Sequence, residues 1–180
     1  KVAEYLHLIK GRVIRGESLI QGLLSYARVG KEEDGEERID TRALLGEILE
    51  NFSLKEGTTV SISEKMPVIY SVRLPLFQVF SNLVDNALKY NDKEQGAVKV
   101  YHKEYPGHWE FFVSDNGPGI SKNYHEKIFM IFQTLKERDS FESTGVGLAI
   151  VKKILDSRAE EIKLESEPGK GSVFSFTWKK

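Results

Sequence analysis

A loop that contains two glycines and a proline constrains the fold of this chain more than any other stretch. It runs from Asp115 to Ile120 with the sequence DNGPGI, and it follows an apolar, strand-like run from Trp109 to Val113. Glycine permits backbone angles and close approaches that a side chain forbids, so a flat ligand can lie against such a turn. The carboxylate of Asp115 can then accept a hydrogen bond from one edge of that ligand. The loop alone is a weak signal, because glycine and proline turns after strands are common.

A second motif lies upstream, on a predicted helix that runs from Pro75 through Lys89. Asn82, Asn86 and Lys89 are spaced by four and three residues and so share one face of this helix. Asparagine is unfavourable inside a helix, so two of them on one stripe require a reason. Amide oxygens suit Mg²⁺, which binds through few protein groups plus phosphates, and a lysine can neutralise a phosphate. The alternative interpretation is an ordinary solvated polar face.

A third motif, from Thr144 to Leu148 with the sequence TGVGL, opens another predicted helix. A glycine-rich turn at a helix N-terminus offers free N–H groups and the positive end of the helix dipole to a phosphate. The spacing matches neither the Rossmann nor the P-loop pattern, and a turn required only for tight packing is the alternative. If the ligand is a nucleotide, Asp115 favours adenine, which presents an amino donor, over guanine, which presents a carbonyl acceptor.

Composition excludes several classes of function. The chain has 26 basic and 27 acidic residues and a net charge of -1, so electrostatics predict no binding to nucleic acid or to an anionic membrane. It has no cysteine, which excludes disulfides and thiolate metal sites. No apolar run approaches the roughly 20 residues that cross a bilayer. We therefore expect a cytoplasmic chain without membrane contact.

Hydrophobic periodicity divides the chain into three predicted segments. Residues 1–29 form a helix whose apolar residues follow the 4,3 spacing of a coiled-coil or bundle seam, and whose apolar face is wide enough to meet another molecule. The alternative is an ordinary core helix. Residues 30–38 form a charged linker, and residues 39–180 form the main domain. The seam residues are Val2, Leu6, Ile9, Val13, Gly16, Ile20, Leu23 and Ala27.

The main domain is predicted to be α+β: a two-layer α/β sandwich with helices on one face of a mixed, mostly antiparallel sheet, preceded by the one long helix. The expected helices are 41–57, 75–89, 125–132 and 146–157. The expected strands are 58–63, 68–72, a hairpin of 97–105 and 108–114, and a closing hairpin of 161–166 and 173–178.

In this order and spacing, the three motifs resemble the ATP-binding domain of sensor histidine kinases. That domain has the Bergerat fold, which gyrase, a heat-shock chaperone and mismatch-repair ATPases share. The resemblance covers about residues 39–180, and the run from Ile128 to Ile154 is most similar to phytochrome-type and related PAS-linked kinases. Residues 1–29 resemble the second helix of the dimerisation and histidine-phosphotransfer hairpin, whose first helix is not in this chain.

The resemblance implies the role of each motif. Asn86 would coordinate Mg²⁺, Lys89 would meet phosphate, and Asp115 would bind the adenine amino group. Residues 125–132 resemble the F box, and residues 133–144 would form a mobile lid over the nucleotide. Asn82 is the expected catalytic residue. The complete set of expected ATP contacts is Asn82, Asn86, Lys89, Tyr90, Asp115, Gly117, Gly119, Ile120, Phe132, Thr144, Gly145, Val146, Gly147 and Leu148.

Two departures from the family pattern stand out. The H box, which holds the histidine that accepts phosphate, is absent, and His7 is followed by Leu8 rather than by an acidic residue. We therefore expect the acceptor histidine to lie outside this chain, and His7 to be a surface residue. The stretch from Asp156 to Glu161 stands where the family usually has a His-Gly-Gly turn, which puts the geometry of that turn in doubt.

The resemblance implies a protein-histidine kinase that positions MgATP, forms a homodimer through the helical hairpin and acts on the receiver domain of a response regulator. One alternative is a related ATPase that hydrolyses ATP. Such relatives carry a glutamate base where this chain has Asn82, and an amide cannot take a proton from water at neutral pH. A second alternative is a nucleotide-binding dimerisation module without turnover.

Overall fold

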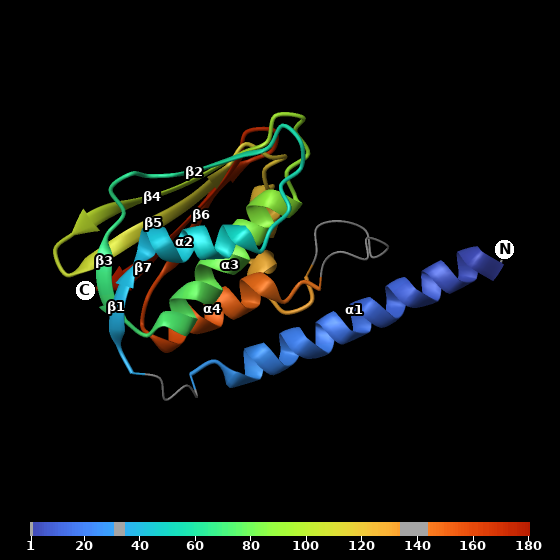
Figure 1. Cartoon of the computed structure of the whole chain (residues 1–180), viewed down its shortest axis with the longest axis horizontal. Coiled ribbons are helices and arrows are strands. Elements are labelled where there is room, and N and C mark those ends of the chain that lie inside the picture. The colour runs from blue at the N-terminus through green and yellow to red at the C-terminus, as the bar shows by residue number, and fades with distance from the viewer. Residues whose placement is uncertain (1, 31–34, 134–143) are drawn as a thin grey trace.

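The computed structural model describes residues 2–30, 35–133 and 144–180, and it consists of a long helix beside a two-layer domain (Figure 1). The helix α1 (Val2–Arg28) has 27 residues, which confirms the long N-terminal helix that the periodicity predicts. At 1.5 Å per residue it is about 40 Å long. Its first half extends beyond the rest of the molecule. Bilayer-spanning helices are absent from the described part of the chain.

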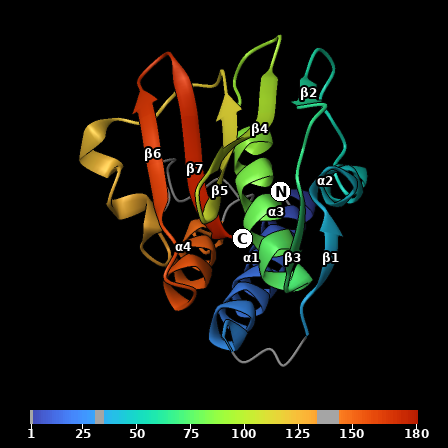
Figure 2. The same ribbon diagram turned by 90° about the vertical axis from the view of Figure 1, so that its left-hand side faces the viewer.

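The main sheet has five strands in the order β2-β4-β5-β7-β6, as seen from one edge to the other in Figure 2. Among the described residues, only the β2–β4 pair of this sheet is parallel, so the predicted mixed, mostly antiparallel sheet is confirmed. A separate antiparallel pair joins β1 and β3. The strands are β1 (Glu37–Asp40), β2 (Thr59–Ile62), β3 (Val68–Ser71), β4 (Ala97–Tyr105), β5 (His108–Asp115), β6 (Ile162–Glu167) and β7 (Gly171–Lys179).

Three helices, α2 (Thr41–Glu50), α3 (Arg73–Lys89) and α4 (Gly147–Ser157), lie on the same side of this sheet (Figure 1). The central helix α3 is anchored by Phe80, whose ring meets Phe111 of β5 and Phe176 of β7 edge-on, with centroids 5.2 Å apart in both pairs. All three rings are buried. Because this side of α3 faces the sheet, the stripe with Asn82 and Asn86 faces α4 instead.

Two local expectations are wrong. The helix α2 ends at Glu50 rather than near Gly57, because the backbone N–H and side chain of Asn51 bond to carbonyls of the last turn and terminate it. Residues 125–132 form no α-helix. Two 3₁₀ turns, η1 (Lys122–Tyr124) and η2 (Lys127–Phe129), stand in this region, and the extended backbone of Met130 stops the second.

The strand β1 was not predicted, because no sequence pattern indicated it. Its first two residues, Glu37 and Arg38, belong to the predicted linker 30–38. Ile39 is the only buried residue of this strand, and it pairs with Ile69 of β3. One apolar residue in a charged run leaves no alternation to detect, so the strand is specified by its partner rather than by its own sequence.

The C-terminus of α4 forms a regular helix-ending turn without glycine. The N–H of Glu160 donates to the Leu155 carbonyl at 2.9 Å, and the N–H of Ala159 donates to the Asp156 carbonyl at 3.2 Å. These two bonds define a Schellman motif, in which the residue at the Ala159 position adopts left-handed angles. Ala159 has φ of +55°, which glycine tolerates far better than alanine. This turn therefore carries backbone strain that a glycine at position 159 would avoid.

We expect Ala159→Gly to stabilise the domain. Removing the Cβ relieves about 1–2 kcal/mol of left-handed strain, which outweighs roughly 0.5–1 kcal/mol of extra backbone entropy in the unfolded chain. The matched control is Ala43→Gly, at an exposed position with helical angles in α2, which should destabilise by up to about 1 kcal/mol. Urea unfolding of both variants measures the two shifts, and destabilisation by Ala159→Gly would contradict the strained turn.

Candidate functional site

A cavity of about 450 Å³ opens between α3, the N-terminus of α4 and the loop that follows β5. All but two of the predicted nucleotide contacts line it, although they come from three separate stretches of the sequence. These lining residues are Asn82, Asn86, Lys89, Tyr90, Asp115, Gly119, Ile120, Thr144, Gly145, Val146, Gly147 and Leu148.

The two amides of α3 differ in how firmly they are held. The side-chain nitrogen of Asn82 donates to the backbone carbonyl of Gln78 at 2.8 Å. Its oxygen faces the start of α4, where a Cβ on Gly147 would lie 2.7 Å away. By contrast, the side-chain nitrogen of Asn86 is buried without a hydrogen-bond partner among the described residues. Asn82 is therefore held by its own helix and lies close to the start of α4, while the side-chain nitrogen of Asn86 is uncommitted among the described residues.

The loop after β5 holds Asp115 at the edge of the cavity. One carboxylate oxygen accepts a hydrogen bond from the N–H of Gly117 at 2.8 Å. Burial raises the pKa of Asp115, and the hydrogen bonds from the backbone N–H groups of Gly117 and Ser172 oppose this rise. Gly117 itself does not line the cavity. A Cβ there would lie 2.8 Å from the Asp115 carboxylate, so this glycine permits the loop conformation that holds the acid.

The same loop packs directly on the turn between β6 and β7. Gly119 has φ of +70°, and a Cβ on it would overlap the carbonyl oxygen of Glu167. Gly171 has φ of +87°, and a Cβ on it would overlap the carbonyl of Asp115 in turn. The N–H of Ile120 donates to the Ser166 hydroxyl at 2.8 Å. Two loops that are distant in sequence thus lie backbone against backbone, which only glycine permits.

Asn116 ties the other side of the loop to β4. Its side-chain oxygen accepts hydrogen bonds from the Ala97 N–H at 2.8 Å and from the Asn91 amide at 2.9 Å, and its amide donates to the Gln95 carbonyl at 3.0 Å. Sequence reasoning assigned this residue no role. With these three hydrogen bonds its side chain orients the loop rather than a ligand.

The N-terminus of α4 forms the opposite wall. No side chain in the described part of the chain caps this helix, so the amides of its first turn lack the usual side-chain partner there. Gly147 and Leu148 of this turn line the cavity. Gly145 has φ of +67°, and its carbonyl accepts a hydrogen bond from the N–H of Phe132 at 2.8 Å. Such an uncapped helix start suits a phosphate or another anion.

Two of the predicted contacts are not brought to the cavity. Gly117 is not among the lining residues, and it contacts the Asp115 carboxylate instead. Phe132 does not line the cavity, and its side chain is 55% exposed. Its backbone has φ of +66°, and its N–H bonds to Gly145, so it shapes the turn before α4. The predicted lid, residues 133–144, falls outside the described residues except for Gln133 and Thr144, which both line the cavity.

Sequence reasoning missed several lining residues. Asp85 could have been found, because it lies three residues after Asn82 and four before Lys89 on the same helix face. Burial raises the pKa of Asp85, and the charge of Lys89 opposes the rise. Gly22 could not have been found, because it belongs to α1. The remaining missed residues, for which no local pattern exists, are Ala87, Pro118, Ile128, Gln133, Ile150, Ser172 and Phe174.

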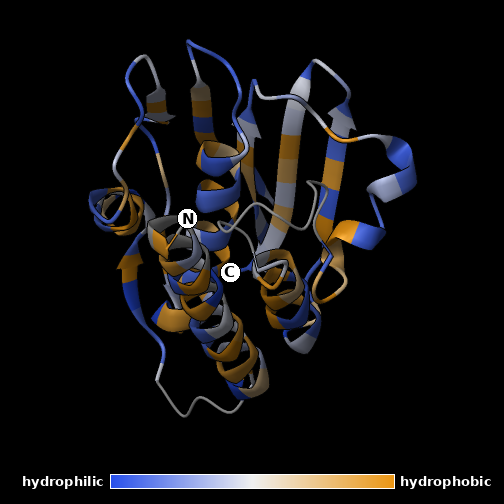
Figure 3. Cartoon of the chain, turned by 90° about the vertical axis from the view of Figure 1, so that its right-hand side faces the viewer, coloured by the Kyte–Doolittle hydropathy of each residue, from blue (hydrophilic) through white to orange (hydrophobic). Residues whose placement is uncertain are grey.

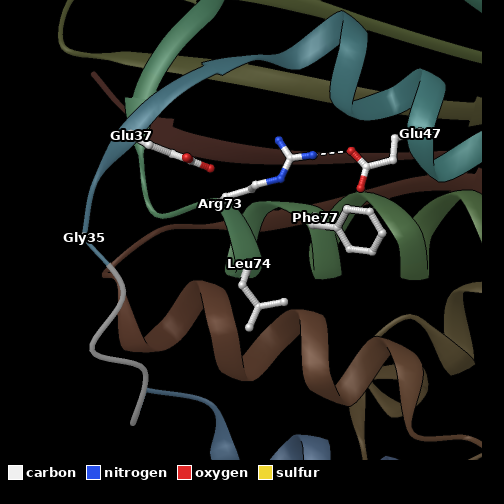
Figure 4. A pocket seen from close by; sticks show the side chains of 6 residues that line it. All are labelled: Gly35, Glu37, Glu47, Arg73, Leu74 and Phe77. Atoms are coloured by element: carbon white, nitrogen blue, oxygen red, sulfur yellow. Dashed lines mark hydrogen bonds and ion pairs between the residues drawn. The ribbon is translucent and has the colours of Figure 1, made fainter.

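A second cavity, of about 500 Å³, lies near the start of α3 (Figure 4). Gly35, Glu37, Glu47, Arg73, Leu74 and Phe77 line it. The guanidinium of Arg73 already donates to the carboxylate of Glu47 across this space. None of the three sequence motifs contributes to it, so we assign the ligand site to the cavity between α3 and α4.

Comparison with known families decides the identity of this fold. The family described as histidine kinase-, DNA gyrase B-, and HSP90-like ATPase matches residues 71–180. The chain belongs to this family. Within residues 71–180 lie all three motifs and every strand of the five-stranded sheet except β2.

Proteins similar to this chain include phytochromes, sensory kinases and a regulatory histidine kinase. Over 164 residues the chain is 35% identical to the phytochrome-like protein Cph1 of Synechocystis, a match that covers 89% of this chain and 22% of Cph1. It is 35% identical to the adaptive-response sensory kinase SasA of Thermosynechococcus vestitus, covering 78% of this chain and 38% of SasA. The resemblance to histidine kinases is confirmed, although the chain spans only about a fifth of the phytochrome relative.

Solved structures confirm the predicted fold class. Full-length ShkA in complex with AMPPNP superposes with a TM-score of 0.77 at 26% identity, covering 97% of this chain and 38% of ShkA. The catalytic domain of the histidine kinase ThkA gives a TM-score of 0.65 at 24% identity, and the match covers 82% of this chain and 97% of the ThkA domain. ThkA in complex with the response regulator protein TrrA gives a TM-score of 0.73 at 23% identity, and the match covers 100% of this chain and 52% of the ThkA chain.

We expect Gly119→Ala to destabilise this ATPase domain far more than Gly107→Ala. Both glycines have positive φ, but a Cβ on Gly107 meets nothing within 4 Å, whereas one on Gly119 overlaps the Glu167 backbone. Gly107→Ala should cost about 1–2 kcal/mol of left-handed strain. Gly119→Ala should add about 1–3 kcal/mol for displacing the β6–β7 turn. Urea unfolding compares them, and equal losses would show that the two loops do not pack as described.

Proposed function

We propose that this chain is the catalytic ATP-binding part of a two-component sensor histidine kinase. It positions MgATP for transfer of the γ-phosphoryl group to a histidine outside the chain. One observation carries the proposal: a single cavity unites a carboxylate acceptor, an uncommitted amide, a lysine and an uncapped helix N-terminus. These are Asp115, Asn86, Lys89 and the start of α4.

The adenine ring belongs at the Asp115 end of the cavity. The carboxylate accepts from the exocyclic amino group of adenine, while guanine would present a carbonyl oxygen to the same charge. Ile120, Ile128 and Phe174 line the cavity and supply apolar surface for the ring. Most small-molecule sites combine such an apolar wall with a few fixed polar groups. The site therefore selects ATP over GTP.

The phosphates belong between Lys89 and the first turn of α4, where a cation and free N–H groups converge. Asn86 fits a Mg²⁺ ligand through its side-chain oxygen, because the side chain lines the cavity and its nitrogen has no hydrogen-bond partner among the described residues that would fix its orientation. Across those residues, no three His, Cys, Asp or Glu side chains gather at a possible metal position. The donor set is thus amide, water and phosphate oxygen, which Mg²⁺ accepts. When bound, the ion neutralises charge on the transferred phosphoryl group.

Phosphoryl transfer fits the site better than hydrolysis. The amide of Asn82 donates to the Gln78 carbonyl and touches α4, and an amide cannot remove a proton from water. Kinases contribute mostly positioning and charge stabilisation to this chemistry, and Asn82 does this by linking α3 to the phosphate end of the cavity. An ATP-hydrolysing relative or a module without turnover remains the alternative that the labelling experiment below tests.

The helix α1 supports a homodimer as the active assembly. Its seam residues Leu6, Ile9 and Val13 are 62%, 58% and 63% exposed. Figure 3 shows apolar bands along most of its length. A face of this size is costly in water and suits the dimerisation bundle of a histidine kinase.

The receiver domain of a response regulator is the proposed recipient of the phosphate, and the cytoplasm is the proposed location. The domain division at residues 29 and 38 is part of this proposal.

We expect Asp115→Asn to weaken MgADP binding by about 10- to 150-fold, because a hydrogen bond to a charged acceptor contributes about 1.5–3 kcal/mol. The variant should also lose discrimination against MgGDP, since an amide can donate to the guanine carbonyl. Calorimetric titration of both nucleotides into both proteins measures the effect. Equal MgADP affinities would show that Asp115 does not contact adenine.

Phosphate transfer can be followed with γ-labelled ATP. We expect no acid-labile phosphate on the 180-residue chain alone, because none of its histidines has the acceptor context. A separate protein that carries the upstream histidine helix should become labelled when this chain is added. Asp115→Asn serves as the matched control and should slow that labelling. Phosphate on His7, found by mass spectrometry, would place the acceptor on α1 and refute the proposed division of roles.

A further inference from the structure

Asp85 is a carboxylate in the nucleotide cavity that none of the motifs explains. It lies on α3 immediately before Asn86, and its side chain lines the cavity with those of Asn82 and Lys89. It is partly buried. Within the described residues its side chain makes no hydrogen bond, and Lys89, one turn further along the helix, acts on it only through its charge, without forming an ion pair. A partly buried carboxylate that lacks a hydrogen-bond partner indicates a ligand that carries positive charge or hydrogen-bond donors.

The position of Asp85 conflicts with a bare nucleotide. A carboxylate beside the phosphate end of the cavity repels a polyanion, and the surrounding protein strengthens this repulsion relative to water. The conflict disappears when a cation lies between the acid and the phosphates. Of the residues that line the cavity in the described ranges, only Asp85 and Asp115 are acidic. Asp115 is held in the glycine loop by Gly117 and is the proposed acceptor for adenine, so Asp85 is the acid available to a cation.

The chemistry of Mg²⁺ supplies the missing partners. This ion keeps several water molecules when it binds through few protein groups, and each of these waters donates hydrogen bonds. An ionised carboxylate only accepts hydrogen bonds, with two oxygens. Asp85 directly precedes Asn86, the proposed ligand, and both side chains line the same cavity. The acid therefore matches the water shell of an ion at Asn86.

We propose that Asp85 is a positioning residue that accepts hydrogen bonds from the water shell of Mg²⁺ and makes the cavity select metal-loaded nucleotide over free nucleotide. This inference rests on the proposed magnesium position at Asn86. Partners outside the ligand sphere commonly change metal affinity by about 10- to 100-fold. Asp85 thus acts in two directions: it strengthens binding of the magnesium complex and weakens binding of the bare nucleotide.

The test measures ADP affinity by calorimetry, once with excess Mg²⁺ and once with EDTA, and compares the ratio of the two affinities. In Asp85→Asn, which keeps the shape and removes the charge, we expect this ratio to fall by about tenfold. ADP in EDTA should bind at least as tightly as to the unaltered protein. The matched control is Asp92→Asn, which removes a charge at an exposed position outside the cavity and should leave the ratio unchanged.

Other outcomes overturn the inference. An unchanged ratio in Asp85→Asn would mean that the carboxylate is only a solvated group, and equal weakening with and without Mg²⁺ would mean that it contacts the nucleotide itself. Asp85→Ser repeats the test if Asp85→Asn does not fold. Asn86→Ala separates the two proposals. If Asn86→Ala lowers the ratio and Asp85→Asn does not, only the proposed role of Asp85 is refuted. If neither variant lowers the ratio, the proposal that Asn86 binds Mg²⁺ is refuted as well.

Discussion

The edge-on contacts of Phe80 with Phe111 and Phe176 determine where α3 lies, and the site depends on that helix. The ring fills the space between helix and sheet, so α3 can neither rotate nor slide without opening a void in the core. Loss of a buried phenylalanine commonly destabilises a protein by about 3–5 kcal/mol. Since the polar stripe is on the other side of the same helix, the apolar core fixes the direction of Asn82, Asp85, Asn86 and Lys89. One side of α3 thus packs on the sheet, and its other side carries the polar residues of the site.

A second constraint acts on the adenine end. The loop after β5 lies against the β6–β7 turn, with Gly119 over Glu167 and Gly171 over Asp115. Contacts between backbones leave no side chain to adjust, so the position of Asp115 follows from the geometry of a hairpin some fifty residues further along the chain. The three side-chain hydrogen bonds of Asn116 hold the loop from its other side. The acid is therefore preorganised, and binding does not have to order it.

The sequence allowed the prediction of those parts of the site whose chemistry requires particular residue types at short spacing. Gly119 and Gly145 have left-handed angles, and Asn82, Asn86 and Lys89 share a helix face, so local patterns found them. Asp85 obeys the same spacing and was still overlooked. The strand β1, with Ile39 as its only buried residue, and wall residues such as Phe174 depend on contacts between distant segments. Local periodicity carries no information about such contacts.

Gly22 shows that the wall of the cavity is shared between two parts of the chain. A Cβ on this residue of α1 would lie 3.2 Å from Val146, which stands between the two glycines at the start of α4. Lys153 of α4 holds the same end of α1 through the carbonyl of Tyr26, at 2.6 Å. If α1 moves away, the cavity loses part of its enclosure, so the position of this helix and the affinity for the ligand are thermodynamically coupled. By reciprocity, a ligand that fills the cavity favours one position of the helix by the same free energy.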